Sequence, residues 1–222
     1  MANAMIPDIS FTTNINQRTL CVLLLDGSAS MAGPAIGELN NGLRDLQDAL
    51  LQDTVARERV RLLVVRIGDL DEVQVLHDWA DATEFQAPTI QANGSTPIGL
   101  AVDLALERIE EQKQQMRSAG ISYTRPLIYI VTDGEPTDPG FEAAAARCAS
   151  SIQANKLQLF AIGTEGASFE NLKKLGGTVL KLNGLNFREL FQFLSNSASS
   201  ASRAGTGQNI QAPLPQSVTI VT

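Results

Sequence analysis

Short, wholly apolar runs alternate along this chain with longer stretches in which apolar residues recur every three or four positions. A short apolar run between turn residues is typical of a buried strand, whereas the longer spacing is typical of a helix with one buried face. The expected strands cover residues 20–25, 59–67, 73–79, 126–132, 157–163 and 178–182. The expected helices begin beyond Ser30 and at the Thr96-Pro97 step, and others cover residues 140–154, 168–175 and about 187–194.

This alternation of strands and helices predicts an α/β fold. Strands that are joined by helices form a mostly parallel sheet that is covered on both faces. The stretch 73–79 differs from the other strands, because Val73, Val75, His77 and Trp79 recur at alternate positions. Such alternation is typical of a half-exposed strand at a sheet edge. We therefore expect a doubly wound, Rossmann-like three-layer sandwich with a mostly parallel, six-stranded sheet and one antiparallel edge strand.

The pattern weakens toward both ends of the chain. Residues 1–17 form a lead-in of weak pattern, and residues 18–196 form the folded domain. Residues 197–222 form a flexible tail, because most of this stretch is rich in Ser, Ala, Gly, Gln and Pro. The last six residues, Ser217–Thr222, are strand-like again. They would either pair with a sheet edge, in this chain or in a partner, or stay disordered.

Charge and composition narrow the classes of partner. The formal net charge of −7 argues against nucleic acid, because phosphate binding favours a basic surface. The longest apolar run is too short to span a bilayer, and Met1–Ser10 lacks the basic and apolar segments of a secretion signal. Cys21 and Cys148 fall in a predicted strand and a predicted helix, which favours two buried free thiols. These features predict a cytoplasmic protein that binds neither nucleic acid nor membrane.

Candidate chemistry is concentrated where the first strand ends. Asp26, Ser28 and Ser30 place one carboxylate and two hydroxyls at alternate positions directly after the apolar run 20–25. Open α/β sheets bind their ligands at this end of the strands. All three side chains offer oxygen, with no thiolate or imidazole nearby in the sequence, so the pattern favours a hard cation such as Mg²⁺.

Two further stretches carry oxygen donors at strand-to-helix turns. Thr96 precedes Pro97 at the start of the second long helix, where it would serve as N-cap, and Asp133 follows the strand 126–132. Taken alone, Ser30 and Thr96 are also explained as helix N-caps, and Asp133 as part of a turn. Together the three stretches favour one metal site, with the candidate ligands Asp26, Ser28, Ser30, Thr96 and Asp133.

This set of residues resembles the metal-ion-dependent adhesion site of the von Willebrand factor A (VWA) family, from the first strand to the last helix. The resemblance implies that Ser28, Ser30 and Thr96 offer hydroxyls to the ion, while Asp26 and Asp133 act partly through water. The implied ion is Mg²⁺, with Mn²⁺ and Ca²⁺ as alternatives. Its open position would accept an Asp or Glu of a partner protein. The implied function is a non-enzymatic, metal-dependent protein interaction.

Two stretches look most similar to bacterial intracellular members of this family. They are Gly-Ser-Thr-Pro-Ile-Gly at 94–99 and Thr-Asp-Gly-Glu-Pro-Thr-Asp at 132–138. Such relatives include proteins associated with tellurium resistance and stress response, which tend to work beside a kinase-like and a metal-dependent phosphatase-like protein. The resemblance therefore implies a role in a complex of this kind.

Two other classes of function are less well supported by the residues. Asp26 beside Mg²⁺ would suit the nucleophile of a phosphoryl-transfer enzyme, as in haloacid-dehalogenase-like phosphatases. That family places a second Asp two residues later, where this chain has Ser28, so an acid/base group is missing. Nucleotide binding lacks both a Gly-x-Gly-x-x-Gly turn and a Gly-Lys-Ser/Thr loop. His77 is the only histidine and lies on another predicted strand, so a nucleophile–base pair is not apparent.

Overall fold

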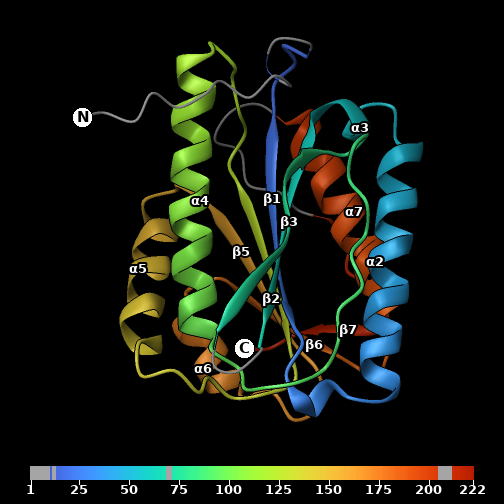
Figure 1. The fold of residues 1–222 in the computed structure, drawn as a ribbon, viewed down its shortest axis with the longest axis vertical. Helices are drawn as coiled ribbons and strands as arrows, with labels where there is room; N and C mark the ends of the chain where they lie inside the picture. The colour runs from blue at the N-terminus through green and yellow to red at the C-terminus, as the bar shows by residue number, and fades with distance from the viewer. Residues whose placement is uncertain (1–10, 12–13, 69–71, 205–211) are drawn as a thin grey trace.

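A sheet of seven strands runs through the middle of the protein (Figure 1). The computed structural model describes Phe11 and residues 14–68, 72–204 and 212–222. Within these residues the strands lie in the order β3-β2-β1-β4-β5-β6-β7, and the two edge strands run antiparallel to their neighbours. The strands are β1 (Thr19–Asp26), β2 (Val60–Ile67), β3 (Val73–Asp81), β4 (Leu127–Thr132), β5 (Gln158–Gly163), β6 (Thr178–Leu182) and β7 (Val218–Ile220).

Helices cover both faces of the sheet (Figure 1). On one face lie α2 (Pro34–Gln52), α3 (Ala56–Arg59) and α7 (Phe187–Arg203). On the other face lie α4 (Ile98–Ser118), α5 (Phe141–Gln153) and α6 (Phe169–Lys174). A short 3-10 helix, η1 (Ala29–Met31), follows the end of β1.

The central strand β1 shows how one apolar run serves two cores. Successive side chains of a strand point to opposite faces of the sheet. Cys21 and Leu23 therefore join the core beneath α2 and α7, whereas Val22 and Leu24 join the core beneath α4 and α5. The second core also contains Cys148, so both cysteines are buried free thiols, as the sequence predicted.

The predicted doubly wound, three-layer α/β fold is confirmed, including the mostly parallel sheet and the antiparallel edge strand β3. The sheet has seven strands rather than the expected six. The additional strand is β7, which pairs antiparallel with β6 through residues 218–220 and 180–182. The strand-like end of the chain therefore pairs with an edge of its own sheet.

The last helix extends into the stretch that the sequence assigned to a flexible tail. Helix α7 continues to Arg203, so residues 197–203 are helical. Ser197 is fully buried, and its hydroxyl donates a hydrogen bond to the carbonyl of Phe193 at 2.8 Å. Because a buried serine can satisfy its hydroxyl within its own helix, the small, polar composition of this stretch is compatible with a packed helix.

An ionic cluster fastens the beginning of the described chain to the edge of the sheet. Asp81 accepts hydrogen bonds from Arg18 at 3.2 Å and from Arg61 at 3.0 Å. The three side chains are between 0% and 8% exposed. The ring of Phe11 lies 5.1 Å from the guanidinium carbon of Arg61, which is cation–π distance. Part of the predicted lead-in thus contacts the domain, although residues 1–10 and 12–13 lie outside the described residues.

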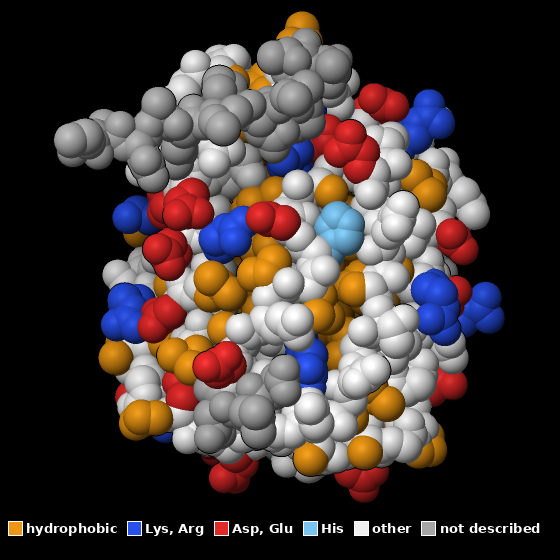
Figure 2. Space-filling view, in the orientation of Figure 1, with side chains coloured by type: hydrophobic (Ala, Val, Ile, Leu, Met, Phe, Trp, Pro, Cys, Tyr) orange, Lys and Arg blue, Asp and Glu red, His pale blue; other side chains and the backbone are white. Residues whose placement is uncertain are grey.

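The face over β3 is shown in Figure 2, where apolar and uncharged side chains cover much of the middle and charged side chains gather on either side. This distribution agrees with the partial burial of Val73, Val75 and Trp79 on β3. None of the helices in the described part of the chain is both long and apolar enough to cross a membrane.

Helices α2 and α7 pack closely at Gly42, and this contact gives a first testable prediction. A Cβ atom at Gly42 would lie 2.3 Å from Cδ2 of Phe191 and 3.1 Å from the carbonyl oxygen of Phe187. We expect Gly42→Ala to lower the free energy of unfolding by about 1–3 kcal/mol, because the two helices must separate. Urea denaturation followed by circular dichroism measures this change.

The matched control is Gly37→Ala in the same helix. A Cβ atom at Gly37 would have no atom within 4 Å apart from its chain neighbours and the backbone of its own helix. Alanine has the higher helix propensity, so this variant should be more stable than the wild type by up to about 1 kcal/mol. Changes of the same sign in both variants would contradict the close packing at Gly42.

Candidate metal site

Three loops meet at one end of the sheet, where β1 lies between β2 and β4. Residues 27–33 follow β1, residues 91–97 precede α4, and residues 133–140 follow β4. The helix after β1 and the helix before β4 cover opposite faces of the sheet (Figure 1). Such a switch point, at the carboxyl ends of parallel strands, is where open α/β sheets bind ligands.

Four of the five predicted ligands are joined here by hydrogen bonds. Asp26 Oδ1 accepts the backbone N–H of Ser28 at 2.8 Å. The hydroxyl oxygens of Ser28 and Ser30 are 2.9 Å apart, and Ser30 Oγ donates to Asp133 Oδ1 at 2.6 Å. Since a serine hydroxyl has one proton, Ser28 is the donor in its contact with Ser30. The structure thus joins the end of β1 to the end of β4 through a chain of hydrogen bonds.

Asp26 is the buried end of this chain, with no exposed surface. Its Oδ2 accepts a hydrogen bond from the hydroxyl of Thr132. Burial raises the pKa of the Asp26 carboxyl above its usual value, hydrogen bonds from Thr132 and Ser28 lower it, and the nearby Asp133 raises it. A divalent cation beside Asp26 would offset both the desolvation and the repulsion between the two carboxylates.

Thr96, the fifth predicted ligand, lies beside the cluster on the third loop. Its residue is 5% exposed, and its Oγ1 would be 3.1 Å from a Cβ atom at Gly134. Its backbone is held by Thr137, because the N–H of Thr96 donates to Thr137 Oγ1 at 3.2 Å and its carbonyl accepts the N–H of Thr137 at 3.1 Å. No described residue makes a hydrogen bond with the hydroxyl of Thr96. Its oxygen therefore has a lone pair and a proton available for a ligand that reaches the cluster.

Helix capping does not explain the hydroxyls of Ser30 and Thr96. Ser30 lies within η1, and α2 begins only at Pro34 without a side-chain cap. Helix α4 begins at Ile98, so the prediction that Thr96 is its N-cap and Pro97 its first residue is wrong. The carbonyl of Thr96 accepts the N–H of Ile98 at 2.8 Å, and this tight turn delays the helix by one residue.

Two residues that the sequence analysis did not select hold the loops in position. Thr132, the last residue of β4, bonds to Asp26 across the sheet. Arg66 of β2 is 6% exposed, and its Nη2 donates to the carbonyls of Gly27 and Asn93 at 3.3 Å each. Arg66 therefore ties the loop after β1 to the loop before α4. Its signal in the sequence is a charged residue inside a strand that is apolar apart from Arg61 and Arg66.

The donors present suit a hard divalent ion. In the described part of the chain, no group of three or more His, Cys, Asp or Glu side chains is placed to hold a metal. Any ion at this cluster would therefore depend on hydroxyl oxygens as well as on two carboxylates. Oxygen donors of this kind fit Mg²⁺, Mn²⁺ or Ca²⁺ and do not favour a site that needs thiolate or imidazole.

The family of the chain follows from its sequence and agrees with this geometry. Residues 21–188 match the description of the von Willebrand factor type A domain. The chain belongs to this family. The match covers β1 from Cys21 onward, β4 and all three loops of the candidate site. No curated protein matches the VWA chain significantly.

Several solved structures share the fold at low sequence identity. The ArnB paralog VWA2 from Sulfolobus acidocaldarius is 19% identical with a TM-score of 0.57, over 82% of this chain and 45% of that chain. Proximal thread matrix protein 1 from the mussel byssus is 13% identical with a TM-score of 0.57, over 82% and 48%. The pilus adhesin SpaC from Lactobacillus rhamnosus GG is 10% identical with a TM-score of 0.63, over 84% and 32%. This VWA chain spans less than half the length of each.

VWA domains generally mediate metal-dependent protein interactions and are typically not enzymes. In this chain His77 lies on the edge strand β3, with its ring centre 5.0 Å from that of Phe85. Strand β2 separates it from β1. Asp26 is fully buried, and both of its oxygens accept hydrogen bonds. These positions disfavour a catalytic triad and disfavour Asp26 as a nucleophile.

Proposed function

We propose that this VWA domain is a non-enzymatic module that binds a protein partner through a divalent metal ion. The proposed ligands are Asp26, Ser28, Ser30, Thr96 and Asp133. The observation that carries the proposal is the cluster itself, in which hydrogen bonds join Asp26, Ser28, Ser30 and Asp133 beside the hydroxyl of Thr96. The ion, when bound, supplies an electrophilic centre for an oxygen of the partner.

Each side chain has a separate role in this proposal. Ser28, Ser30 and Thr96 hold the ion with neutral hydroxyls, and a serine hydroxyl can donate to a carboxylate while its lone pair faces a metal. Asp26 and Asp133 balance the charge, partly through water. Mg²⁺ is the proposed ion, because such an ion keeps several waters and needs no closed cage of protein ligands. Mn²⁺ and Ca²⁺ accept the same donors.

We propose a partner carboxylate, from Asp or Glu, as the group that completes the coordination. Asp26 and Ser28 lie buried beneath the cluster, whereas Ser30 is exposed and Asp133 is half-buried. A partner would therefore approach from the side of Ser30 and Asp133. The proposed direct ligands are neutral hydroxyls, whereas Asp26 and Asp133 act partly through water. A charged oxygen in direct contact therefore binds the ion more strongly than another neutral one.

The cellular setting is a further part of the proposal. The stretches 94–99 and 132–138 support a bacterial cytoplasmic protein in a stress-response or tellurium-resistance complex, with a kinase-like or phosphatase-like partner. Affinity capture from native lysate, with Mg²⁺ or with a chelator, tests this setting. Capture of such a partner only with Mg²⁺ supports it, whereas a set of captured proteins that is indifferent to metal contradicts it.

The hydroxyl of Thr96 gives a second testable prediction. We expect Thr96→Val to weaken Mn²⁺ binding by at least about tenfold, since even outer-shell groups at metal sites contribute this much. The free energy of unfolding without metal should change by less than about 1 kcal/mol, because the hydroxyl has no partner to lose. Electron paramagnetic resonance of free Mn²⁺ measures binding to the full chain.

Thr96→Ser is the control for this prediction, because it keeps the hydroxyl and removes a methyl group. It should bind Mn²⁺ within about threefold of the wild type, which is less than 1 kcal/mol. Wild-type affinity in Thr96→Val would rule out direct ligation by Thr96. Failure of the wild type itself to bind Mn²⁺ or Mg²⁺ would overturn the metal-dependent function.

A further inference from the structure

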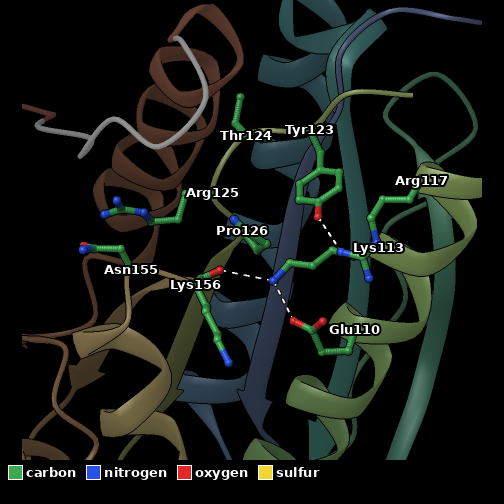
Figure 3. Close-up of a pocket in the computed structure, with 9 residues that line it drawn as sticks. All are labelled: Glu110, Lys113, Arg117, Tyr123, Thr124, Arg125, Pro126, Asn155 and Lys156. Carbon is green, nitrogen blue, oxygen red and sulfur yellow. Dashed lines mark hydrogen bonds and ion pairs between the residues drawn. The ribbon is translucent and has the colours of Figure 1, made fainter. Parts of the chain in front are cut away.

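A basic cavity lies at the end of the sheet opposite to the candidate metal site. It has a volume of about 300 Å³ and lies where α4 ends and where β4 and β5 begin (Figure 3). Helix α4 begins beside the metal site and contains 21 residues. The cavity is lined by the second half of this helix, so at 1.5 Å per residue the two places lie about 20–30 Å apart. The cavity is therefore separate from the candidate metal site.

The charge of the cavity is opposite to that of the whole protein. Four basic side chains, Lys113, Arg117, Arg125 and Lys156, and one acidic side chain, Glu110, line it. Their formal charge is +3, whereas the chain carries −7. A basic cavity on an acidic protein gives anions a local point of attraction on a surface that otherwise repels them.

Lys113 is held within the fold by two hydrogen bonds. Its side chain is 7% exposed. Its Nζ donates to Glu110 at 2.7 Å and to the carbonyl of Lys156 at 3.2 Å, as the dashed lines in Figure 3 show. Lys113 therefore has a structural role and supplies a fixed positive charge.

Arg117 and Lys156 have no such structural use. No carboxylate among the described residues forms an ion pair with Arg117, whose Nη1 donates to the hydroxyl oxygen of Tyr123 at 2.8 Å. The Nζ of Lys156 makes no hydrogen bond or ion pair with any described residue. Because Tyr123 accepts from Arg117, its own proton can be donated to a ligand. The lining thus offers mainly donors.

The ends of two helices reduce the positive charge without cancelling it. Helices α4 and α5 end at Ser118 and Gln153, beside the cavity. Each helix C-terminus contributes roughly half a negative charge. The lining therefore keeps a net positive charge, which favours an anion with several acceptor oxygens. A phosphate monoester carries about −1.5 to −2 charges and three acceptor oxygens.

We propose that this cavity binds a phosphoryl group, either free or carried on a phosphorylated side chain. Arg117 and Lys156 contact its oxygens from α4 and from the loop before β5, and Lys113 adds charge from beneath. Figure 3 shows the side chains of Arg117 and Arg125 on opposite sides of Lys113. Guanidinium groups suit phosphoryl oxygens, because they present several N–H donors in one plane.

The test is calorimetric titration of the full chain with inorganic phosphate, with phosphoserine and with glutamate, in the presence of a metal chelator. The pocket variant is Arg117→Gln with Lys156→Gln, and the matched control is Arg44→Gln with Lys181→Gln. All four side chains belong to exposed residues. We expect the pocket variant to weaken binding of the phosphoryl ligands by more than about tenfold, and the control by less than about twofold.

Inorganic phosphate and phosphoserine distinguish the two possible sources of the phosphoryl group. Tighter binding of phosphoserine supports a phosphorylated side chain, and equal binding supports a free phosphate. Absence of binding, equal losses in both double variants, or glutamate binding as tight as phosphoserine would overturn the proposal. Asp133→Asn should bind phosphoserine like the wild type, so failure of the proposed metal site and failure of this cavity can be told apart.

Discussion

Replacing Asp81 with alanine should lower the free energy of unfolding by about 3–5 kcal/mol, the cost of removing one partner from a buried ionic cluster. Arg18 and Arg61 both donate to Asp81, and their side chains are 0% and 2% exposed. Burial lowers the pKa of Arg18, and Asp81 raises it. Without Asp81, two guanidinium charges would stay buried without the carboxylate between them. Chemical denaturation at neutral pH measures the loss.

Asp78→Ala is the control on the same strand. Asp78 pairs with Arg108 of α4, but its side chain is 66% exposed. An exposed ion pair contributes at most about 1 kcal/mol, so this variant should stay close to the wild type. If both variants lost a similar free energy of unfolding, burial of the ionic cluster would not be the reason that Asp81 stabilises the protein.

The sequence predicts best the strands whose two faces are both buried, because nearly all of their residues are then apolar. The run from Cys21 to Leu25 is a strand because each residue must join one of two apolar cores. The limits of α7 and the pairing of β7 could not be predicted in this way. Ser197 looks like a linker residue until its hydroxyl is seen to bond within a helix. Strand β7 has three residues, and its place depends on the free edge of β6.

At the candidate site, the sequence predicts the candidate ligands but not the contacts that support them. The positions of Asp26, Ser28, Ser30 and Asp133 at strand ends could be read from the sequence, and the structure brings their side chains together. The supporting contacts could not be read, because they join distant parts of the chain. Thr132 lies 106 positions from Asp26, for example. Sequence spacing shows which oxygens are available, whereas only the fold shows which groups hold them.

The basic cavity illustrates the limit of net charge as an argument. A charge of −7 argues against large polyanions across the whole surface. It does not describe one end of the sheet, where Lys113 and Arg117 of α4 meet Arg125 and Lys156 from two other segments. These residues are separated along the chain, so their grouping depends on the way in which β4 and β5 lie beside α4.

Asp133→Asn should abolish most of the stabilisation that a divalent ion gives to this protein. Asp133 accepts the Ser30 hydroxyl at 2.6 Å, and we expect its neutral replacement to weaken Mn²⁺ binding by about 10- to 100-fold. At a concentration 100 times the dissociation constant, an ion stabilises the wild type by about 2.7 kcal/mol, whereas a 100-fold weaker site gains about 0.4 kcal/mol. Denaturation with Mn²⁺ and with chelator measures both values.

Glu135→Gln is the control for Asp133→Asn in the same measurement. Glu135 is an exposed residue of the same loop, and its replacement removes the same negative charge. It should retain nearly all of the stabilisation, since general attraction between exposed charges and an ion is weak in salt solution. Without metal, Asp133→Asn should unfold at about the same denaturant concentration as the wild type, because Asp133 is half-buried and its repulsion of Asp26 is removed. If Mn²⁺ stabilised Asp133→Asn as much as the wild type, the ion would have to bind elsewhere. If both variants lost the same amount of Mn²⁺ stabilisation, the ion would be responding to negative charge in general and not to ligation by Asp133.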